Sequence, residues 1–315
     1  MKKTIRKALS AVLSLSVILG VVQLGSVPAK AAANDFVVVN GVLVDYNGAA
    51  ASVRIPDTVN SIGDYAFNEC YSLENIIIPK SVTSIGRYAF SSCESIKKLT
   101  IPDSVTSIGN YAFNECTSLK DITISNNLKS IGIGSFYNCS SLSKITLPST
   151  LVSIGKNAFD GCSDLSSATF QSSGGTFGAD IFNSCGSLTI NGYTNSAIQT
   201  YASKAKIPFK STGMGKLIVD AKNCILPTNG TYTIGTKMIG TGLTLKSSMS
   251  KSKIIKMVSD GGEYKITPLK PGTVNVTFTV YDKDKKKLGY ATVKITVQKG
   301  ATARSDGKKQ EVKLS

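Results

Sequence analysis

The chain has 315 residues, of which 36 are lysine or arginine, 20 are aspartate or glutamate, seven are cysteine and none is histidine or tryptophan. Without histidine, no Ser-His-Asp or Cys-His catalytic group and no histidine-ligated metal site can form. The commonest general base near neutral pH is also missing, so the composition favours a non-enzymatic protein, although lysine- or carboxylate-based catalysis stays open.

The net charge of +16 is distributed unevenly along the chain. Residues 1–33 contain five bases and no acid, residues 34–212 contain 12 bases and 13 acids, and residues 213–315 contain 19 bases and seven acids. This charge pattern indicates a nearly neutral middle region followed by a strongly basic C-terminal region.

The first 33 residues have the three parts of a secretory signal peptide. Four bases among the first seven residues precede an uncharged apolar run over residues 8–24, and small residues at 28–33 form a processing site. An uncleaved membrane anchor is the alternative, but serines and glycines interrupt the run. We expect cleavage near residue 32 or 34, a mature protein outside the cytoplasm and no later transmembrane span.

A repeat of 23 residues occupies the middle of the chain. Five blocks begin in register at Ile55, Ile78, Ile101, Ile124 and Leu147, and a sixth, more divergent block begins at Phe170. No insertion or deletion interrupts the register. Such a repeat predicts a solenoid, in which side chains that one turn cannot bury alone pack against the same positions of neighbouring turns.

Each block supplies the same inward-facing side chains. The recurring residues are Phe67, Phe90, Phe113, Phe136, Phe159 and Phe182 at one position, and Ile62, Ile85, Ile108, Ile131, Ile154 and Phe177 at another. A short alternating segment in each block, such as residues 96–101, predicts a strand, and strands stacked about 4.8 Å apart form a parallel ribbon. The glycine after each Ser-Ile pair suits a tight turn that a side chain would obstruct.

Six cysteines recur at the same spacing, each three residues after the phenylalanine: Cys70, Cys93, Cys116, Cys139, Cys162 and Cys185. This places phenylalanine and cysteine on the inner side of a helical turn and predicts a ladder of buried thiols. Parallel Cβ vectors fit a disulfide poorly, and the Cys-x-x-Cys pairs of zinc sites are absent, so disulfides and metal thiolates are weaker alternatives. Cys224 has no evident partner. We expect neither a metal nor a cofactor.

The pattern IPxSVTSIGxxAFxxCxSL resembles the bacterial surface leucine-rich repeats of the BspA type. Residues 36–48 look like the N-terminal hairpin cap of that family, and residues 192–209 look like its closing cap. The resemblance covers about residues 35–211. It implies a horseshoe or rod-like leucine-rich-repeat solenoid and a non-enzymatic, ligand-binding role, with adhesion to host proteins or other cells through partners that differ widely between members.

Two stripes of outward-facing strand residues are candidates for ligand binding. One consists of Asn75, Lys98, Asp121, Lys144 and Ser167, and the other of Ile77, Thr100, Thr123, Thr146 and Thr169. Solenoids commonly bind partners on such extended surfaces. The threonines also fit the preference of β-branched residues for solvated strands, which is the simpler interpretation of the second stripe.

Three tyrosines, Tyr65, Tyr88 and Tyr111, occupy one position of three successive blocks. Tyrosine is a favoured anchor in interfaces, so these residues are candidate ligand contacts. Packing along the edge of the solenoid is the alternative.

After residue 212 the repeat stops and short alternating runs replace it. The clearest are residues 274–280 and 291–297, which predict two strands joined by a turn. Regular short strands predict a β-sandwich over residues 213–299. Residues 265–274 and 294–297 resemble the bacterial Ig-like domains of surface proteins.

The basic region includes four lysines in one predicted turn, Lys283, Lys285, Lys286 and Lys287. Their charge predicts attraction to an anionic cell-wall polymer, which salt would weaken. A solvated face is the alternative. We expect no nucleic-acid binding, because the chain is predicted to be exported and no aromatic residues are interleaved with the lysines.

Together these features predict four regions: a signal peptide (1–33), the repeat domain with its caps (34–212), an Ig-like β-sandwich (213–299) and a disordered basic tail (300–315). We expect a secreted or surface-associated, non-enzymatic protein that recognises an extracellular protein or glycan. A carbohydrate-binding accessory module that uses the tyrosines is the first alternative, and a carboxylate-based hydrolase is the least favoured.

Overall fold

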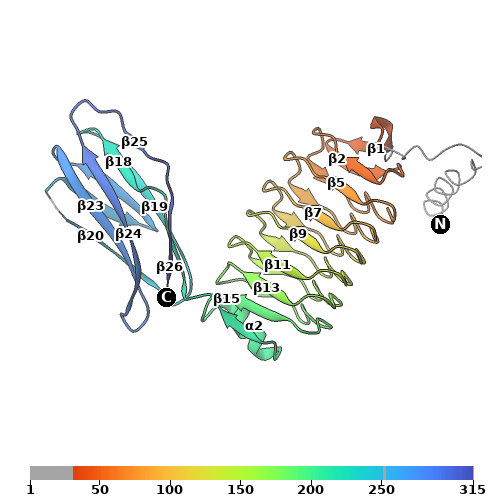
Figure 1. Cartoon of the computed structure of the whole chain (residues 1–315). Helices are drawn as coiled ribbons and strands as arrows, with labels where there is room; N and C mark the ends of the chain where they lie inside the picture. The colour runs from red at the N-terminus through yellow and green to blue at the C-terminus, as the bar shows by residue number, and fades with distance from the viewer. Residues whose placement is uncertain (1–30, 251–252, 315) are drawn as a thin grey trace, which may run out of the picture. The chain divides into compact units, whose positions relative to one another are not determined.

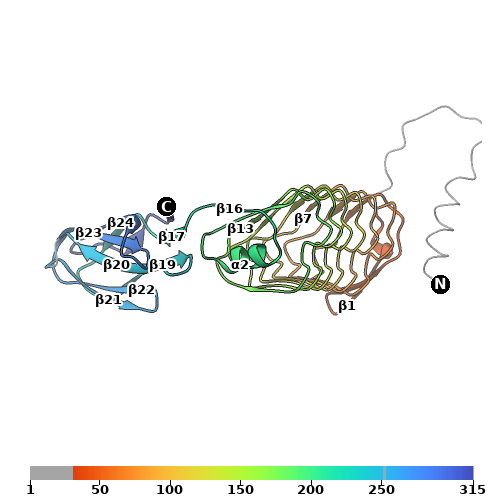
Figure 2. The same ribbon diagram turned by 90° about the horizontal axis from the view of Figure 1, so that it is seen from below.

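The computed structural model describes residues 31–250 and 253–314, so the predicted signal peptide, apart from its last three residues, lies outside the described residues. The chain forms two compact units (Figures 1 and 2). The first contains the residues up to Asn191 together with Thr200–Lys210, and the second contains Gly192–Gln199 and the residues from Ser211 onward. The predicted closing cap is therefore divided between the two units.

The first unit is a solenoid in which each turn carries short strands on two sides (Figure 1). On one side an eight-stranded sheet has the order β1-β2-β4-β6-β8-β10-β12-β14. The bounds are β1 (Phe36–Val39), β2 (Val42–Tyr46), β4 (Ser61–Ile62), β6 (Ser84–Ile85), β8 (Ser107–Ile108), β10 (Ser130–Ile131), β12 (Ser153–Ile154) and β14 (Thr176–Phe177). The β1–β2 hairpin is antiparallel, as predicted for the N-terminal cap, and the strands that follow are parallel.

The strands on the other side form shorter sheets, β3-β5, β7-β9 and β11-β13-β15-β16. Their bounds are β3 (Ser52–Arg54), β5 (Asn75–Ile77), β7 (Lys98–Thr100), β9 (Asp121–Thr123), β11 (Lys144–Leu147), β13 (Ser167–Phe170), β15 (Thr189–Gly192) and β16 (Phe209–Ser211). The helices of the described residues are η1 (Ala33–Asp35) and α2 (Ala197–Lys204), and neither combines the length and apolarity needed to cross a bilayer.

Neighbouring turns pair at the 23-residue step that the sequence predicts. Ser61 and Ile62 face Ser84 and Ile85, and the same step continues along the sheet. The six recurring phenylalanines stack with ring centroids 5.0 to 5.4 Å apart. Figure 2 shows successive turns following nearly the same path. The predicted solenoid is confirmed.

The predicted helical turn between phenylalanine and cysteine is a single hydrogen-bonded turn and not a helix. The Cys70 N–H donates to the Phe67 carbonyl at 3.2 Å. Tyr65 and Glu69 lie on either side of the Phe67 position, and both have a φ of 60°. This left-handed conformation does not occur within a right-handed helix. The prediction of an inward-facing Phe–Cys pair still holds, because both side chains are buried.

The recurrent glycines allow one turn to approach the next, rather than providing a left-handed turn. A Cβ at Gly109 would lie 2.7 Å from the carbonyl carbon of Gly86 and 2.8 Å from the backbone nitrogen of Arg87. Real Cβ atoms essentially never approach backbone so closely. The glycines therefore set the spacing between turns on this side of the solenoid.

The second unit contains two five-stranded sheets, with the orders β21-β22-β19-β17-β26 and β20-β23-β24-β18-β25. The bounds are β17 (Gly215–Val219), β18 (Asn223–Leu226), β19 (Tyr232–Ile239), β20 (Thr244–Met249), β21 (Ile255–Asp260), β22 (Glu263–Pro268), β23 (Gly272–Tyr281), β24 (Lys287–Val297), β25 (Arg304–Ser305) and β26 (Gln310–Leu314). The predicted hairpin is confirmed, since Val276 faces Val293 and Phe278 faces Ala291.

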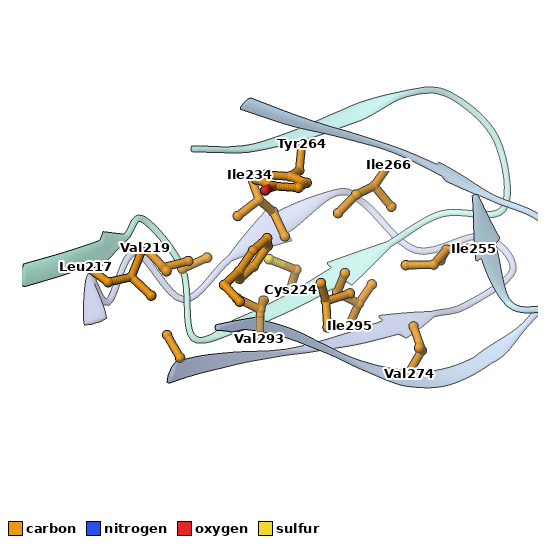
Figure 3. Close-up of a cluster of buried hydrophobic side chains, with 14 of the residues drawn as sticks. Leu217, Val219, Cys224, Ile234, Ile255, Tyr264, Ile266, Val274, Val293 and Ile295 are labelled. Carbon is orange, nitrogen blue, oxygen red and sulfur yellow. The ribbon is translucent and has the colours of Figure 1, made fainter. Parts of the chain in front are cut away.

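The two sheets enclose one apolar core (Figure 3). Ile234 and Tyr264 from one sheet point toward Val293 and Ile295 from the other (Figure 3). Cys224, for which the sequence offered no partner, is 8% exposed and belongs to this core. Its thiol therefore acts as a small apolar side chain.

The last residues of the chain do not form the predicted disordered tail. Strand β26 pairs antiparallel with β17 over five residue pairs, from Gly215–Leu314 to Val219–Gln310. The Leu314 side chain is 1% exposed and part of the core. The prediction was wrong because one buried leucine and a strand edge with free hydrogen-bonding groups outweigh the polar composition of the segment.

We expect Gly109→Ala to lower the free energy of unfolding of the solenoid by about 1 to 3 kcal/mol, because the new methyl group would overlap the backbone of the preceding turn. Urea-induced unfolding followed by circular dichroism measures the change. Gly174→Ala is the matched control, since a Cβ there would meet nothing within 4 Å. Equal losses in both variants would show that close approach is not the reason for the glycine.

Leu314→Ala should destabilise the second unit by about 2 to 3 kcal/mol, because it removes a buried side chain from the core. Lys313→Ala on the same strand should change stability by no more than about 0.5 kcal/mol, since Lys313 is exposed. Hydrogen exchange at the β17 and β26 amides reports the opening of this edge. Fast exchange of these amides in the unmodified chain would contradict the observed strand.

Candidate functional site

The first predicted stripe lies on the outer surface of β5, β7, β9, β11 and β13. Asn75, Lys98 and Lys144 are exposed, and Asp121 and Ser167 are half-buried. Lys98 and Asp121 face each other in register and form an ion pair of 3.8 Å, with the lysine side chain 81% exposed. A pair so open to water contributes little stability. These side chains are therefore available for a partner.

The second stripe runs beside the first on the same strands. Ile77 is 53% exposed, Thr100, Thr123 and Thr146 are exposed, and Thr169 is half-buried. A groove of about 300 Å³ crosses both stripes, lined among others by Thr123, Asn126, Lys144, Thr146 and Gln171. The structure thus brings two predicted stripes and two further polar residues to one surface.

Asn126 and Gln171 were not identified from the sequence. A signal is nevertheless present, because most blocks have proline at their second position, whereas the fourth block has Ser125 and the sixth has Gln171. Asn126 follows the first of these replacements. Two departures from the repeat therefore coincide with the groove.

The three predicted tyrosines form a continuous stack. The ring centroids of Tyr65 and Tyr88 are 5.0 Å apart, as are those of Tyr88 and Tyr111, and the rings of both pairs are nearly parallel, with an interplanar angle of 9°. The fourth turn has Gly134 at this position, and the Tyr111 ring covers it. The faces of Tyr88 are therefore occupied by its neighbours, and the stack presents mainly ring edges and hydroxyl groups to solvent.

An arginine lies beside this stack. The Arg87 guanidinium lies 5.5 Å from the ring centroid of Tyr65 and 5.6 Å from that of Tyr88, and its Nη2 donates a hydrogen bond of 3.1 Å to the Tyr65 hydroxyl. Tyr65 is exposed, whereas Tyr88 and Tyr111 are half-buried. The tyrosines therefore pack along the edge of the solenoid and also leave an edge exposed, while both faces of the Tyr88 ring are covered by its neighbours.

A second groove, of about 420 Å³, runs along the eight-stranded sheet. Its lining includes Ser107, Ser130 and Ser153 with the glycines that follow two residues later, and Ile133 at its margin is 43% exposed. Sequence reasoning assigned the Ser-Ile-Gly motif only to a turn. The lining therefore combines serine side chains with glycines, whose lack of a Cβ lets successive turns approach each other.

The predicted cysteine ladder is present inside the solenoid. The Cys93, Cys116 and Cys139 thiols each donate a hydrogen bond of 3.1 to 3.2 Å to the carbonyl of a phenylalanine in the preceding turn. Burial raises the pKa of Cys116 to about 12 and also raises the pKa of Cys93 and of Cys139. These thiols are protonated, unreactive parts of the core and not a chemical site.

Of the four predicted lysines, Lys283, Lys285 and Lys286 occupy the turn between β23 and β24, and Lys287 is the first residue of β24. An Asp282 carboxylate oxygen accepts hydrogen bonds from the backbone N–H of Asp284 and of Lys286, which shapes the turn. Lys285 has a φ of 63°, and the Lys287 ammonium lies 4.1 Å from the ring centroid of Tyr290. Lys283 and Lys286 are exposed. No group of three or more acidic or cysteine side chains that could hold a metal ion occurs within residues 31–250 and 253–314.

Residues 46–146 and 129–205 match the model of the BspA type leucine rich repeat region, in six copies. The chain belongs to the BspA-type leucine-rich repeat family. This family resemblance indicates a role in protein interaction or adhesion, and BspA-type proteins are typically non-enzymatic binding proteins. No curated protein shows significant similarity to this BspA-type chain.

Several solved structures are similar to the BspA-type chain. A leucine-rich repeat protein of T. pallidum is 24% identical, with a TM-score of 0.44, over 58% of this chain and 98% of that one. A leucine-rich cell surface protein of Faecalibacterium prausnitzii is 25% identical, with a TM-score of 0.34, over 46% and 55% of the two chains. The functional domain of InlJ from Listeria monocytogenes, which includes a cysteine ladder, is 12% identical, with a TM-score of 0.21, over 78% and 62%.

The raised thiol pKa values predict a loss of stability in alkali. The pKa of the Cys116 thiol is about 12 in the folded chain and 9.0, its ordinary value, in the unfolded chain. The contribution of this thiol to the free energy of unfolding is therefore complete below pH 9 and is lost as the pH rises toward about 12, because the unfolded chain loses its thiol proton first. Urea midpoints should therefore be level near neutral pH and fall above about pH 9. Cys116→Ala should start from a lower midpoint and fall less steeply. Parallel pH profiles for the two chains would contradict this assignment.

Proposed function

We propose that the protein is exported and acts at the cell surface as a non-enzymatic adhesion protein whose solenoid recognises another protein. The alignment of the outward strand residues on one exposed surface carries this proposal. Membership of the BspA-type family supports it, as does the signal-peptide pattern of residues 1–33. The function requires no cofactor.

The strand surface fits protein recognition because it is long, polar and repetitive. Lys98 and Lys144 alternate with Asp121 along the first stripe, so that charges of both signs recur from turn to turn. Alternating charges select a partner by complementarity and penalise a shifted register. The groove with Asn126 and Gln171 adds donors and acceptors at one point of this surface.

The second unit serves in this proposal as an Ig-like spacer that also attaches the protein to the cell wall. Two sheets around one apolar core support the Ig-like assignment. The parallel pairing of β18 with β24 is a departure from wholly antiparallel sheets. The excess of bases in residues 213–315 supports attraction to anionic polymers.

We expect Lys98→Glu with Lys144→Glu, in the full chain, to weaken binding to its protein partner at least about fivefold, because the two changes reverse the sign of the stripe. Beads coated with the purified protein are presented to immobilised extracellular proteins and to insoluble polysaccharides, and retention is measured. Lys129→Glu with Lys156→Glu is the control, since these exposed lysines lie beside β10 and β12 of the eight-stranded sheet.

Retention on proteins that is lost only in the stripe variant supports the proposal. Retention on polysaccharide that is lost on replacing Tyr65, Tyr88 and Tyr111 with serine would support the carbohydrate-binding alternative instead. Equal binding by the stripe variant and its control would contradict the assignment of the strand surface.

A further inference from the structure

The two sheets of the second unit differ in charge. The strands of the β20-β23-β24-β18-β25 sheet contain four bases and no acid, whereas those of the β21-β22-β19-β17-β26 sheet contain five bases and three acids. Because the sheets share one core, the outward faces carry this difference to the surface. One face is therefore uniformly basic and the other is mixed.

The acids of the mixed sheet neutralise part of its charge directly. Lys216 pairs with Glu311 at 3.1 Å, and Lys265 pairs with Asp260 at 2.9 Å. Within residues 31–250 and 253–314, no lysine of β20 or β24 forms an ion pair. The cations of the basic face are thus available to an external anion.

Aromatic rings, and not acids, contact two of these cations. The Lys287 ammonium lies 4.1 Å from the ring centroid of Tyr290, and the Lys246 ammonium lies 5.5 Å from that of Tyr281. Strand register places Lys246, Thr279 and Tyr290 in one row across three strands, and Tyr281 in the next row. Cation–π contacts position a lysine without neutralising it.

Hydroxyl groups cover the rest of this face. Thr277 and Thr292 are in hydrogen-bond contact at 3.1 Å across β23 and β24, and Thr273 and Thr296 approach to 3.4 Å. Lys294 is exposed between these two rows. Within each pair one hydroxyl donates to the other, which leaves one O–H per pair to donate to an external acceptor. The face therefore combines separate positive charges with neutral donors.

We propose that the outward face of the β20-β23-β24 strands binds a linear phosphodiester polymer of the cell wall. The inference rests on the proposed attachment role of the second unit and names its ligand class and contact surface. The turn after β23 continues the face with Lys283, Lys285 and Lys286, which outnumber the two acids of the same turn, Asp282 and Asp284.

The chemistry of the face favours phosphate over the other polymeric anions. Its central cations are all lysines, which act as point charges suited to phosphate, whereas planar carboxylates are best matched by the arginine fork. Single-stranded nucleic acids stack their bases on aromatic faces, and here a lysine ammonium lies over one face of Tyr281 and one face of Tyr290. A phosphodiester polymer without bases uses every feature of the surface.

The test measures binding of the purified full chain to poly(glycerol phosphate). Lys246→Gln with Lys287→Gln should weaken binding about fivefold for each lysine removed, and affinity should fall as salt rises. Lys237→Gln with Lys256→Gln removes the same charge from exposed positions of the other sheet and should change affinity by less than about twofold. Circular dichroism confirms that each variant is folded.

Equal losses in the two variants would show that only net charge matters and would overturn the assignment of the face. Polyglutamate or single-stranded DNA of matched charge binding as tightly as poly(glycerol phosphate) would overturn the ligand class. Binding to poly(glycerol phosphate) that is tighter than to the other polyanions, and that only the Lys246→Gln, Lys287→Gln variant loses, supports both the assigned face and the ligand class.

Salt washes of the producing cells separate this inference from the attachment role. Salt-sensitive retention that is unchanged in the Lys246→Gln, Lys287→Gln variant would support the attachment role but contradict the assignment of the β20-β23-β24 face. Release of the full chain into the medium at low salt would overturn the proposed attachment role. The binding measurement with poly(glycerol phosphate) would then still test whether the β20-β23-β24 face binds the polymer.

Discussion

Each turn of the solenoid packs almost entirely against the same positions of the turns before and after it. The stacked phenylalanines, 5.0 to 5.4 Å apart, require every block to have the same length, because one inserted residue would move a ring out of the stack. The outward residues then also align. The stripes, the tyrosine stack and both grooves therefore follow from the register of the core.

The identity of the ladder cysteines has a physical explanation in the same packing. The Phe90 carbonyl accepts one hydrogen bond from the Cys93 backbone N–H at 3.3 Å and another from the Cys116 thiol at 3.2 Å. Alanine in place of Cys116 would leave the Phe90 carbonyl with one hydrogen-bond donor fewer. Serine there would bring a more polar hydroxyl group into an apolar core. A thiol is small, weakly polar and a donor, so it meets both requirements.

The repeat made the solenoid predictable, because a spacing without insertions determines which residues stack. The predicted hairpin around Val276 and Val293 was equally accessible, since strict alternation marks a half-buried strand. Strand β26 was missed because only Leu314 among its side chains is buried, and a polar strand at a sheet edge has almost no hydrophobic pattern.

The surface was harder to predict than the core. The spacing of Tyr65, Tyr88 and Tyr111 predicts that they stack, but it does not say that stacking would leave mainly ring edges exposed. Grooves depend on how closely successive turns approach each other, as at Gly109, and on single departures from the repeat, such as Gln171. The charge difference between the two sheets depends on which strands become neighbours, and strand order is decided by tertiary packing.

The in-register pairing of blocks of equal length makes the solenoid extensible. A duplicated block of 23 residues would place its phenylalanine, cysteine and glycine in environments that already exist, and neither end of the ladder would need to change. Gene duplication within the repeat could therefore lengthen the recognition surface by one strand spacing at a time. The reach of such a protein toward its partner is thus a quantity that evolution can adjust in whole turns.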